Sequence, residues 1–193
     1  MVRQEPLLCT RKIAVLGFRA VGKTSLTSSF VSGSPPPTSA YDPTIENTYH
    51  KTIRFRRVHF ATDIVDTAGM DEYSRLSRNA SVGVHGYLMV YSLSSHQSFK
   101  KVAQINSTLL NMLGDVQAVP RVLVATMSDL TTERAVTRAQ GEALASEWGV
   151  PYVECSGKTG ESVREAFHCL LREIEKDGDL LAEGESLGGC QIL

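Results

Sequence analysis

The chain has 193 residues, a length at which one domain with a substantial apolar core is expected. Its 20 basic residues nearly balance 21 acidic residues, so the formal net charge of −1 provides no overall field for binding nucleic acid or acidic lipid. No apolar run is long enough to span a membrane, and residues 1–6 lack the apolar core of a signal peptide, so we expect synthesis and retention in the cytosol.

Segments with strand-like composition alternate with segments of helical periodicity along the chain. Capping boxes are predicted at two helix starts, from Thr137 with Gln140 and from Ser162 with Glu165. The alternation predicts an α/β domain with a six-stranded, mostly parallel sheet, one antiparallel hairpin strand, and helices on both faces. The predicted strands are 13–16, 49–55, 58–65, 86–92, 121–126 and 152–155, and the predicted helices include 97–113, 138–148 and 162–175.

Residues 17–24 fit the pattern G-x-x-x-x-G-K-[ST] of a phosphate-binding loop. A predicted strand precedes the loop and a helix-like run follows it, so backbone N–H groups should point at phosphate oxygens. Lys23 is expected to reach the β- and γ-phosphates of a nucleotide, and the Thr24 hydroxyl to ligate Mg²⁺. An ordinary glycine-rich turn is the alternative. The residues expected around the phosphates are Gly17, Ala20, Val21, Gly22, Lys23, Thr24 and Ser25.

Two later segments suit a nucleotide-dependent switch. Asp66 ends a predicted buried strand and is expected to hold Mg²⁺ through water, while the Gly69 N–H meets a γ-phosphate oxygen. Thr44 offers a hydroxyl to Mg²⁺ and an N–H to the γ-phosphate, so loss of that phosphate would release its segment. This segment consists of Tyr41, Asp42, Pro43, Thr44, Ile45, Glu46 and Asn47.

Together these motifs resemble, in order and spacing, the Ras superfamily of small GTPases, and most closely its Rheb branch. The similarity runs from Thr10 to about Glu175, and Arg19 favours the Rheb branch because most relatives have glycine there. The resemblance implies a single P-loop GTPase domain that binds GTP or GDP with Mg²⁺ and hydrolyses GTP. It also implies a monomeric domain with Tyr41 among its nucleotide contacts and residues 41–47 as its effector segment. The implied partners are a GTPase-activating protein and an effector kinase complex of the target-of-rapamycin type.

The guanine-reading motif departs from the family pattern Asn-Lys-x-Asp, because this chain has Thr126-Met127-Ser128-Asp129. The Asp129 carboxylate can still accept hydrogen bonds from guanine N1–H and N2–H₂. Thr126 is expected to be too short for the bridging hydrogen bonds that the family's asparagine makes. Met127 keeps an apolar stem against the base but lacks the ammonium of lysine.

Two further positions of the predicted guanine site depart from the family pattern. Ser156-Gly157-Lys158 has glycine where the family has alanine, although the Gly157 N–H can still reach guanine O6. Pro37 replaces an aromatic residue that packs on the base in the family. Together the changes at the base cost an expected 2–4 kcal/mol, roughly one and a half to three decades of affinity, so nucleotide should bind but exchange readily.

Hydrolysis is expected to be very slow. Met70 stands where most of the family has the glutamine that orients the attacking water. Arg19 could stabilise transition-state charge within the site, or it could project outward and obstruct an incoming arginine finger. The residues assigned to catalysis are Lys23, Thr44 and Gly69, with Arg19 as a possible member and Met70 in place of the glutamine.

Domain boundaries are predicted from composition: a flexible N-terminus at 1–9, the GTPase domain at 10–176, and a disordered acidic tail at 177–193. The tail ends in Cys190-Gln191-Ile192-Leu193, a C-a-a-X pattern whose final leucine indicates geranylgeranylation of Cys190. A single lipid beside acidic residues predicts reversible attachment to the cytoplasmic side of endomembranes, with a cytosolic pool.

Two alternatives to a GTPase switch are considered. A nucleotide-poor scaffold could present the same effector surface without cycling, given the changes at Thr126, Met127, Pro37 and Met70. A metabolic nucleotide kinase would share the phosphate-binding loop, but the chain lacks an arginine-rich lid over a phosphoryl acceptor.

Overall fold

A computed structural model describes residues 7–34, 44–55, 58–70, 76–114 and 119–176. The predictions for Tyr41, Asp42, Pro43 and Pro37, and those for the tail with Cys190, fall outside these residues. In chain order the elements are β1 (Leu7–Gly17), α1 (Lys23–Ser32), β2 (Glu46–Phe55), β3 (Val58–Thr67), β4 (Gly86–Ser92), α2 (His96–Leu113), β5 (Arg121–Thr126), the 3₁₀ turn η1 (Thr131–Glu133), α3 (Arg138–Trp148), β6 (Tyr152–Glu154) and α4 (Val163–Ile174).

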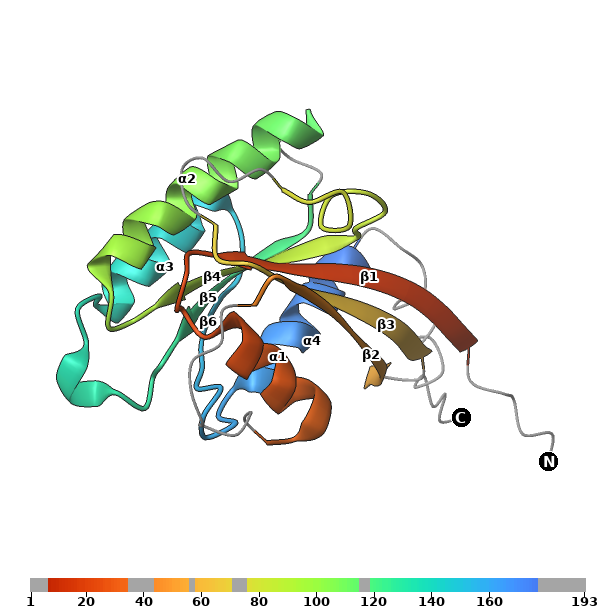
Figure 1. Cartoon of the computed structure of the whole chain (residues 1–193), viewed down its shortest axis with the longest axis horizontal. Coiled ribbons are helices and arrows are strands. Elements are labelled where there is room, and N and C mark those ends of the chain that lie inside the picture. The colour runs from red at the N-terminus through yellow and green to blue at the C-terminus, as the bar shows by residue number, and fades with distance from the viewer. Residues whose placement is uncertain (1–6, 35–43, 56–57, 71–75, 115–118, 177–193) are drawn as a thin grey trace, which may run out of the picture.

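The six strands form one sheet in the order β2-β3-β1-β4-β5-β6 (Figure 1). β2 is antiparallel to β3, in a register that runs from Glu46 opposite Thr67 to Phe55 opposite Val58, and the other neighbours are parallel. The predicted fold class is therefore confirmed. β1 is longer than predicted: it begins at Leu7 and pairs there with Val58, so the strand starts inside the segment expected to be flexible.

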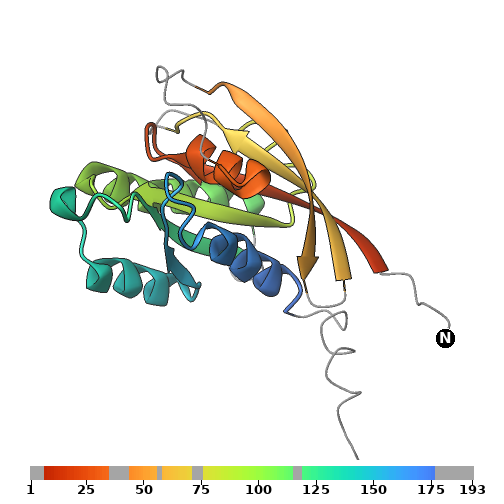
Figure 2. The same ribbon diagram turned by 90° about the horizontal axis from the view of Figure 1, so that it is seen from below.

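Helices cover both faces of the sheet, α1 with α4 on one side and α2 with α3 on the other (Figures 1 and 2). An apolar core lies on each face of the sheet. Successive residues of β1 pack into one core and then the other, because side chains alternate between the two faces along a strand. Ile13 packs into the core under α1 and α4, and Ala14 into the core under α2 and α3. Phe30 of α1 stacks on Phe167 of α4 with ring centroids 3.8 Å apart, which locks these two helices together.

Of the two predicted capping boxes, the one at the start of α3 is confirmed and the one at the start of α4 is wrong. Thr137 and Gln140 cap α3 reciprocally, as predicted. Ser162 adopts a left-handed backbone conformation, with φ of 52°, and its side chain makes no capping bond to α4. An N-cap residue needs an extended backbone to aim its oxygen at the first turn, so the predicted box with Glu165 cannot form. Of the helices in the described ranges, none combines the length and the apolar character needed to cross a membrane.

Candidate functional site

The carboxyl ends of β1, β3 and β5 and the segment after β6 meet at one edge of the sheet, and the predicted site residues gather there. The loop between β1 and α1 curls around the Lys23 ammonium, which donates to the carbonyls of Gly17 at 3.1 Å and Phe18 at 3.0 Å. Ala20 and Gly22 take the left-handed conformation, with φ of 56° and 83°. This turn brings the amino end of α1 to the centre of the site.

Lys23 is 6 % exposed and its charge is poorly compensated. Burial lowers the pKa of Lys23 to about 8, and the nearby Asp66 carboxylate only partly opposes this shift. An anion within reach of the ammonium would stabilise the charged form and raise the pKa again. The buried Lys23 is therefore placed to receive negative charge at the amino end of α1.

Thr24, Thr44 and Asp66 supply the oxygens of the predicted metal site. The hydroxyls of Thr24 and Thr44 lie 2.8 Å apart, although the two residues are separated by a long stretch of chain. Asp66 is completely buried, and apart from the nearby Thr24 hydroxyl its carboxylate oxygens have no hydrogen-bond partner among the described residues. Burial raises the pKa of Asp66, while the Thr24 hydroxyl and the Lys23 charge oppose this.

A buried carboxylate is costly unless its charge is compensated, and the raised pKa shows that Thr24 and Lys23 compensate that of Asp66 only in part. Mg²⁺ prefers oxygen ligands and keeps several waters, so one carboxylate and two hydroxyls suit it. The described residues contain no group of three or more His, Cys, Asp or Glu that could hold a metal. The donor set of Thr24, Thr44 and Asp66 thus fits a nucleotide-associated Mg²⁺ better than a metal bound by protein alone.

The turn after β3 packs directly on the phosphate-binding loop. A Cβ on Gly69 would lie 2.4 Å from the Arg19 Cα, so only glycine fits, and the Met70 N–H donates to the Gly17 carbonyl at 3.0 Å. The Thr67 hydroxyl also donates to the Val15 carbonyl at 2.8 Å. These contacts bring Gly69 beside the loop, as its predicted role at a γ-phosphate requires.

The side chains of Met70 and Arg19 lie in different surroundings, one buried and the other exposed. Met70 is 6 % exposed and belongs to the core under α2 and α3, with Val65 and Leu76. Arg19 is exposed, and its guanidinium carbon lies 5.3 Å from the centroid of the Phe18 ring. The exposure of Arg19 fits the outward alternative rather than a contact with the γ-phosphate.

Asp129 is oriented by Ser156, whose hydroxyl donates to the Asp129 Oδ1 at 2.6 Å. Ser156 is fully buried, and its hydroxyl also accepts from the Thr159 N–H at 3.1 Å. The segments after β5 and β6 are joined further by the Ser128 N–H, which donates to the Cys155 carbonyl at 3.2 Å. The carboxylate predicted to read guanine is thus fixed by a side chain predicted only as part of the base loop.

Thr126 does bridge to the phosphate-binding loop, so the prediction that it is too short was wrong. Its hydroxyl lies 2.5 Å from the Val21 carbonyl oxygen and 3.0 Å from that of Tyr91. Gly22, which follows Val21, takes the left-handed conformation with φ of 83°, and at this turn the Val21 carbonyl lies within reach of the Thr126 hydroxyl. A hydroxyl on a short side chain is therefore enough to span the gap between the loop and β5.

Met127 lies against the same loop. Its backbone is left-handed, with φ of 63°, and its sulfur accepts a hydrogen bond from the Ser92 hydroxyl at 3.0 Å. The Met127 methyl carbon would lie 3.9 Å from a Cβ on Gly22. The thioether therefore occupies the side of the predicted base pocket, anchored by a serine that sequence reasoning missed.

Gly157 is buried against the first turn of α1. A Cβ there would lie 2.9 Å from the Leu26 N and 3.1 Å from the Ser25 Cβ. The glycine that replaces the expected alanine therefore matches a close approach of α1 to this loop. Lys158, the next residue, is exposed.

The described part of the predicted effector segment is largely at the surface. Ile45 is 89 % exposed, and Asn47 is exposed beside it. Glu46 instead accepts hydrogen bonds from the Asn79 amide at 2.9 Å and from the Ser77 hydroxyl. This link between β2 and the 77–79 turn had no sequence signal, because it joins distant polar side chains.

Comparison with known proteins gives one consistent picture. The Ras family model matches residues 12–176. The chain is 45 % identical over 183 residues to the GTP-binding protein Rheb homolog of Dictyostelium discoideum and to the GTP-binding protein rhb1 of Schizosaccharomyces pombe, covering 95 % of this chain and 97 % of each relative. It is 40 % identical over 184 residues to the GTP-binding protein Rheb of Homo sapiens, with the same coverage.

Proposed function

The chain belongs to the Ras family as a Rheb-like small GTP-binding protein, and we propose that it is a signalling switch that holds GTP or GDP with Mg²⁺ and hydrolyses GTP slowly. The observation that carries the proposal is the phosphate half of the site. Lys23 is held at the centre of its loop, the Thr24 hydroxyl lies 2.8 Å from that of Thr44, and Thr24 also neighbours the buried Asp66 carboxylate.

Each of these groups has a role in holding the nucleotide. Lys23 and the loop N–H groups bind the phosphates, Thr24 and Thr44 ligate Mg²⁺, and Asp66 holds it through water. When bound, the ion neutralises charge that develops on the phosphates. Because Thr44 adjoins the exposed Ile45, ordering of Thr44 by a γ-phosphate would also order the surface that an effector reads.

Slow hydrolysis follows from Met70. Its side chain is apolar and buried in the core under α2 and α3, so it cannot orient the attacking water. Arg19 lies against Phe18 on the exposed side of the loop and does not replace that function. The remaining rate enhancement then comes from Lys23, Mg²⁺ and the Gly69 N–H.

A single-turnover hydrolysis assay on GTP-loaded protein tests this proposal. We expect Met70→Gln to raise the rate by roughly tenfold or more, since water orientation is a major part of the family's catalysis. Met70→Leu is the matched control, because it keeps the apolar packing of Met70 and should keep the slow rate. A wild-type rate that already equals that of Met70→Gln would contradict the role assigned to Met70.

Guanine affinity should be lower than is usual for the family, although by less than the sequence suggested. Thr126 retains its bond to the phosphate-binding loop, so the remaining losses are the ammonium at Met127 and the aromatic residue replaced by Pro37. These amount to roughly 1–3 kcal/mol, or about one to two decades of affinity. Readily exchanging nucleotide is the expected behaviour.

The partners and the membrane belong to the same proposal. Similarity to GTP-binding proteins named Rheb supports regulators and effectors of a small GTPase in general. From the family resemblance we propose an effector kinase complex of the target-of-rapamycin type and a GTPase-activating protein as regulator. The final Cys190-Gln191-Ile192-Leu193 supports a geranylgeranyl anchor on the cytoplasmic side of endomembranes, with a cytosolic pool. Cell fractionation of Cys190→Ser is the test: the variant should move to the soluble fraction, and unchanged membrane binding would contradict the anchor.

A further inference from the structure

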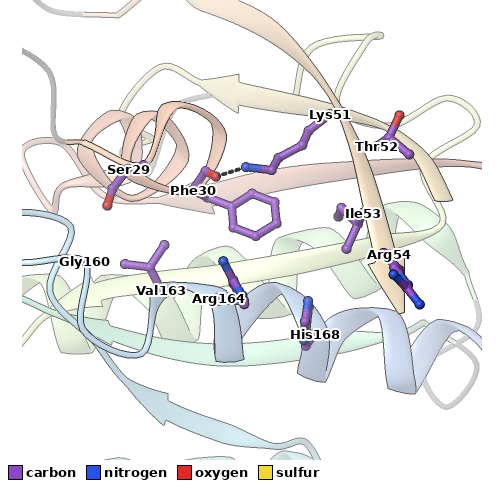
Figure 3. Close-up of a pocket in the computed structure, with 11 residues that line it drawn as sticks. Ser29, Phe30, Lys51, Thr52, Ile53, Arg54, Gly160, Val163, Arg164 and His168 are labelled. Atoms are coloured by element: carbon purple, nitrogen blue, oxygen red, sulfur yellow. Dashed lines mark hydrogen bonds between the residues drawn. The ribbon is translucent and has the colours of Figure 1, made fainter. Parts of the chain in front are cut away.

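A hollow of about 460 Å³ opens at the carboxyl end of α1, the end opposite the phosphate-binding loop (Figure 3). Its walls are the last turn of α1, the edge strand β2 and the first turns of α4. None of its eleven lining residues belongs to the nucleotide site described above. The hollow has the volume of a small-molecule pocket, and we call it the α1–α4 groove.

Basic side chains and an apolar floor share this groove. Phe30, Ile53 and Val163 form the floor, and none of the eleven lining residues is acidic. Arg164 and His168 come from α4 on one side, and Lys51 reaches in from β2 on the other (Figure 3). Arg54 of β2 completes the basic set.

These positive groups lack compensating charge. In the described ranges, the side chains of Arg54 and Arg164 form no hydrogen bond or ion pair. Lys51 donates to the Val31 carbonyl at 3.0 Å and to the Phe30 carbonyl, which fixes its ammonium at the groove without neutralising it. Burial lowers the pKa of Lys51, and the charge of Arg164 lowers it further.

His168 also lies close to positively charged side chains, Arg164 and Arg172. Burial lowers the pKa of His168, Arg164 and Arg172 lower it further, and Glu165 opposes them. The Glu165 carboxylate pairs with Arg172 at 4.0 Å and accepts a hydrogen bond from the Cys169 thiol. Its negative charge therefore compensates only part of the positive charge at the groove. The ring is held edge-on to Phe55, with centroids 5.4 Å apart.

We propose that the α1–α4 groove binds a small, multiply phosphorylated anion, either a soluble phosphate ester or the phosphorylated headgroup of a lipid. Arginine forks match phosphate oxygens in pairs, and Lys51 adds a fixed point charge. The hydroxyls of Ser29 and Thr52 line the same space, and the apolar floor would accept a carbon ring. A groove of this volume, on a chain whose net charge is −1, does not provide the extended basic stripe that nucleic acid needs.

Calorimetry on the full chain tests the proposal, with the nucleotide site filled by GDP and Mg²⁺ so that phosphates do not compete there. The soluble probe is inositol trisphosphate. The lipid probe is phosphatidylcholine vesicles with a few mole per cent phosphatidylinositol bisphosphate, compared with phosphatidylserine vesicles of equal charge. Arg54→Gln with Arg164→Gln should weaken binding by roughly tenfold to a hundredfold, because each arginine supplies charge-assisted hydrogen bonds.

Lys100→Gln with Arg138→Gln is the matched control, since it removes the same charge from exposed positions on α2 and α3. It should leave binding unchanged. Amide chemical shifts of Gly160 and Val163 should move on titration of the unsubstituted protein, which locates the anion even if a variant fails to fold. Binding to the soluble probe, or to the phosphoinositide vesicles alone, supports the groove and identifies the source of the anion. Absence of binding in both arms, or binding that the two double variants weaken equally, overturns it.

Discussion

Replacement of Thr126 by valine tests how this chain holds its phosphate-binding loop with an altered base motif. The two side chains have nearly the same shape, so the change removes the hydroxyl and leaves the packing. The Thr126 hydroxyl, 2.5 Å from the Val21 carbonyl oxygen, is then lost at a position only 2 % exposed. The lost hydrogen bond and the carbonyl left without a partner together cost about 1–3 kcal/mol.

If this free energy appears in nucleotide binding, Thr126→Val should release a fluorescent GDP analogue roughly fivefold to a hundredfold faster than the wild type. Urea unfolding of the GDP-bound protein should show a lower free energy of unfolding by a similar amount. Thr126→Ser is the control, because it keeps the hydroxyl and should stay close to the wild type in release rate. Equal release rates and equal stabilities for the valine variant and the wild type would refute the bridging role of Thr126.

Three further outcomes follow from the geometry of the site. Gly157→Ala places a Cβ 2.9 Å from the Leu26 N, and overpacking of this kind should lower the free energy of unfolding by about 1–3 kcal/mol, measured by urea titration. Gly69→Ala places a Cβ 2.4 Å from the Arg19 Cα, so the turn must move, and calorimetry should show weaker GTP binding; unchanged affinity would argue against a contact between this turn and the γ-phosphate. Because the pKa of Lys23 falls from 10.5 to about 8 in the folded, nucleotide-free protein, the unfolded chain binds the proton more tightly, and stability should rise across that pH range by on the order of 3 kcal/mol. Bound GDP keeps Lys23 charged and should flatten the rise, and a rise of the same size with GDP would count against direct contact with phosphate.

The loop geometry of the phosphate half could be predicted because its pattern is local in sequence. The spacing of Gly22, Lys23 and Thr24 after an apolar strand specifies a loop whose backbone and side chains act together. The sheet could be predicted for a similar reason, since alternating strand and helix patterns leave few topologies. The capping box at Thr137 could be predicted because it requires only two residues that lie three positions apart.

The contacts at the predicted guanine site could not be predicted from local sequence patterns, because they join residues far apart in the chain. The bridge from Thr126 to Val21 depends on how closely two backbones approach, and the sulfur contact of Met127 depends on Ser92 of another strand. The left-handed conformation of Ser162, which abolished a predicted cap, is set by the turn that precedes α4 and not by the capping pattern. Distances between elements decided each of these outcomes.

The nucleotide content of freshly purified, full-length protein tests the central claim most directly. The protein would be denatured and the released nucleotide identified and quantified by chromatography, before and after prolonged dialysis against buffer containing Mg²⁺. A switch with an intact phosphate half and a weakened base half should carry about one guanine nucleotide per chain, lose it gradually in dialysis, and regain it when GTP and Mg²⁺ are added. Protein that is isolated empty and does not take up added GTP would contradict a cycling switch and would favour a scaffold that presents the same surface without nucleotide.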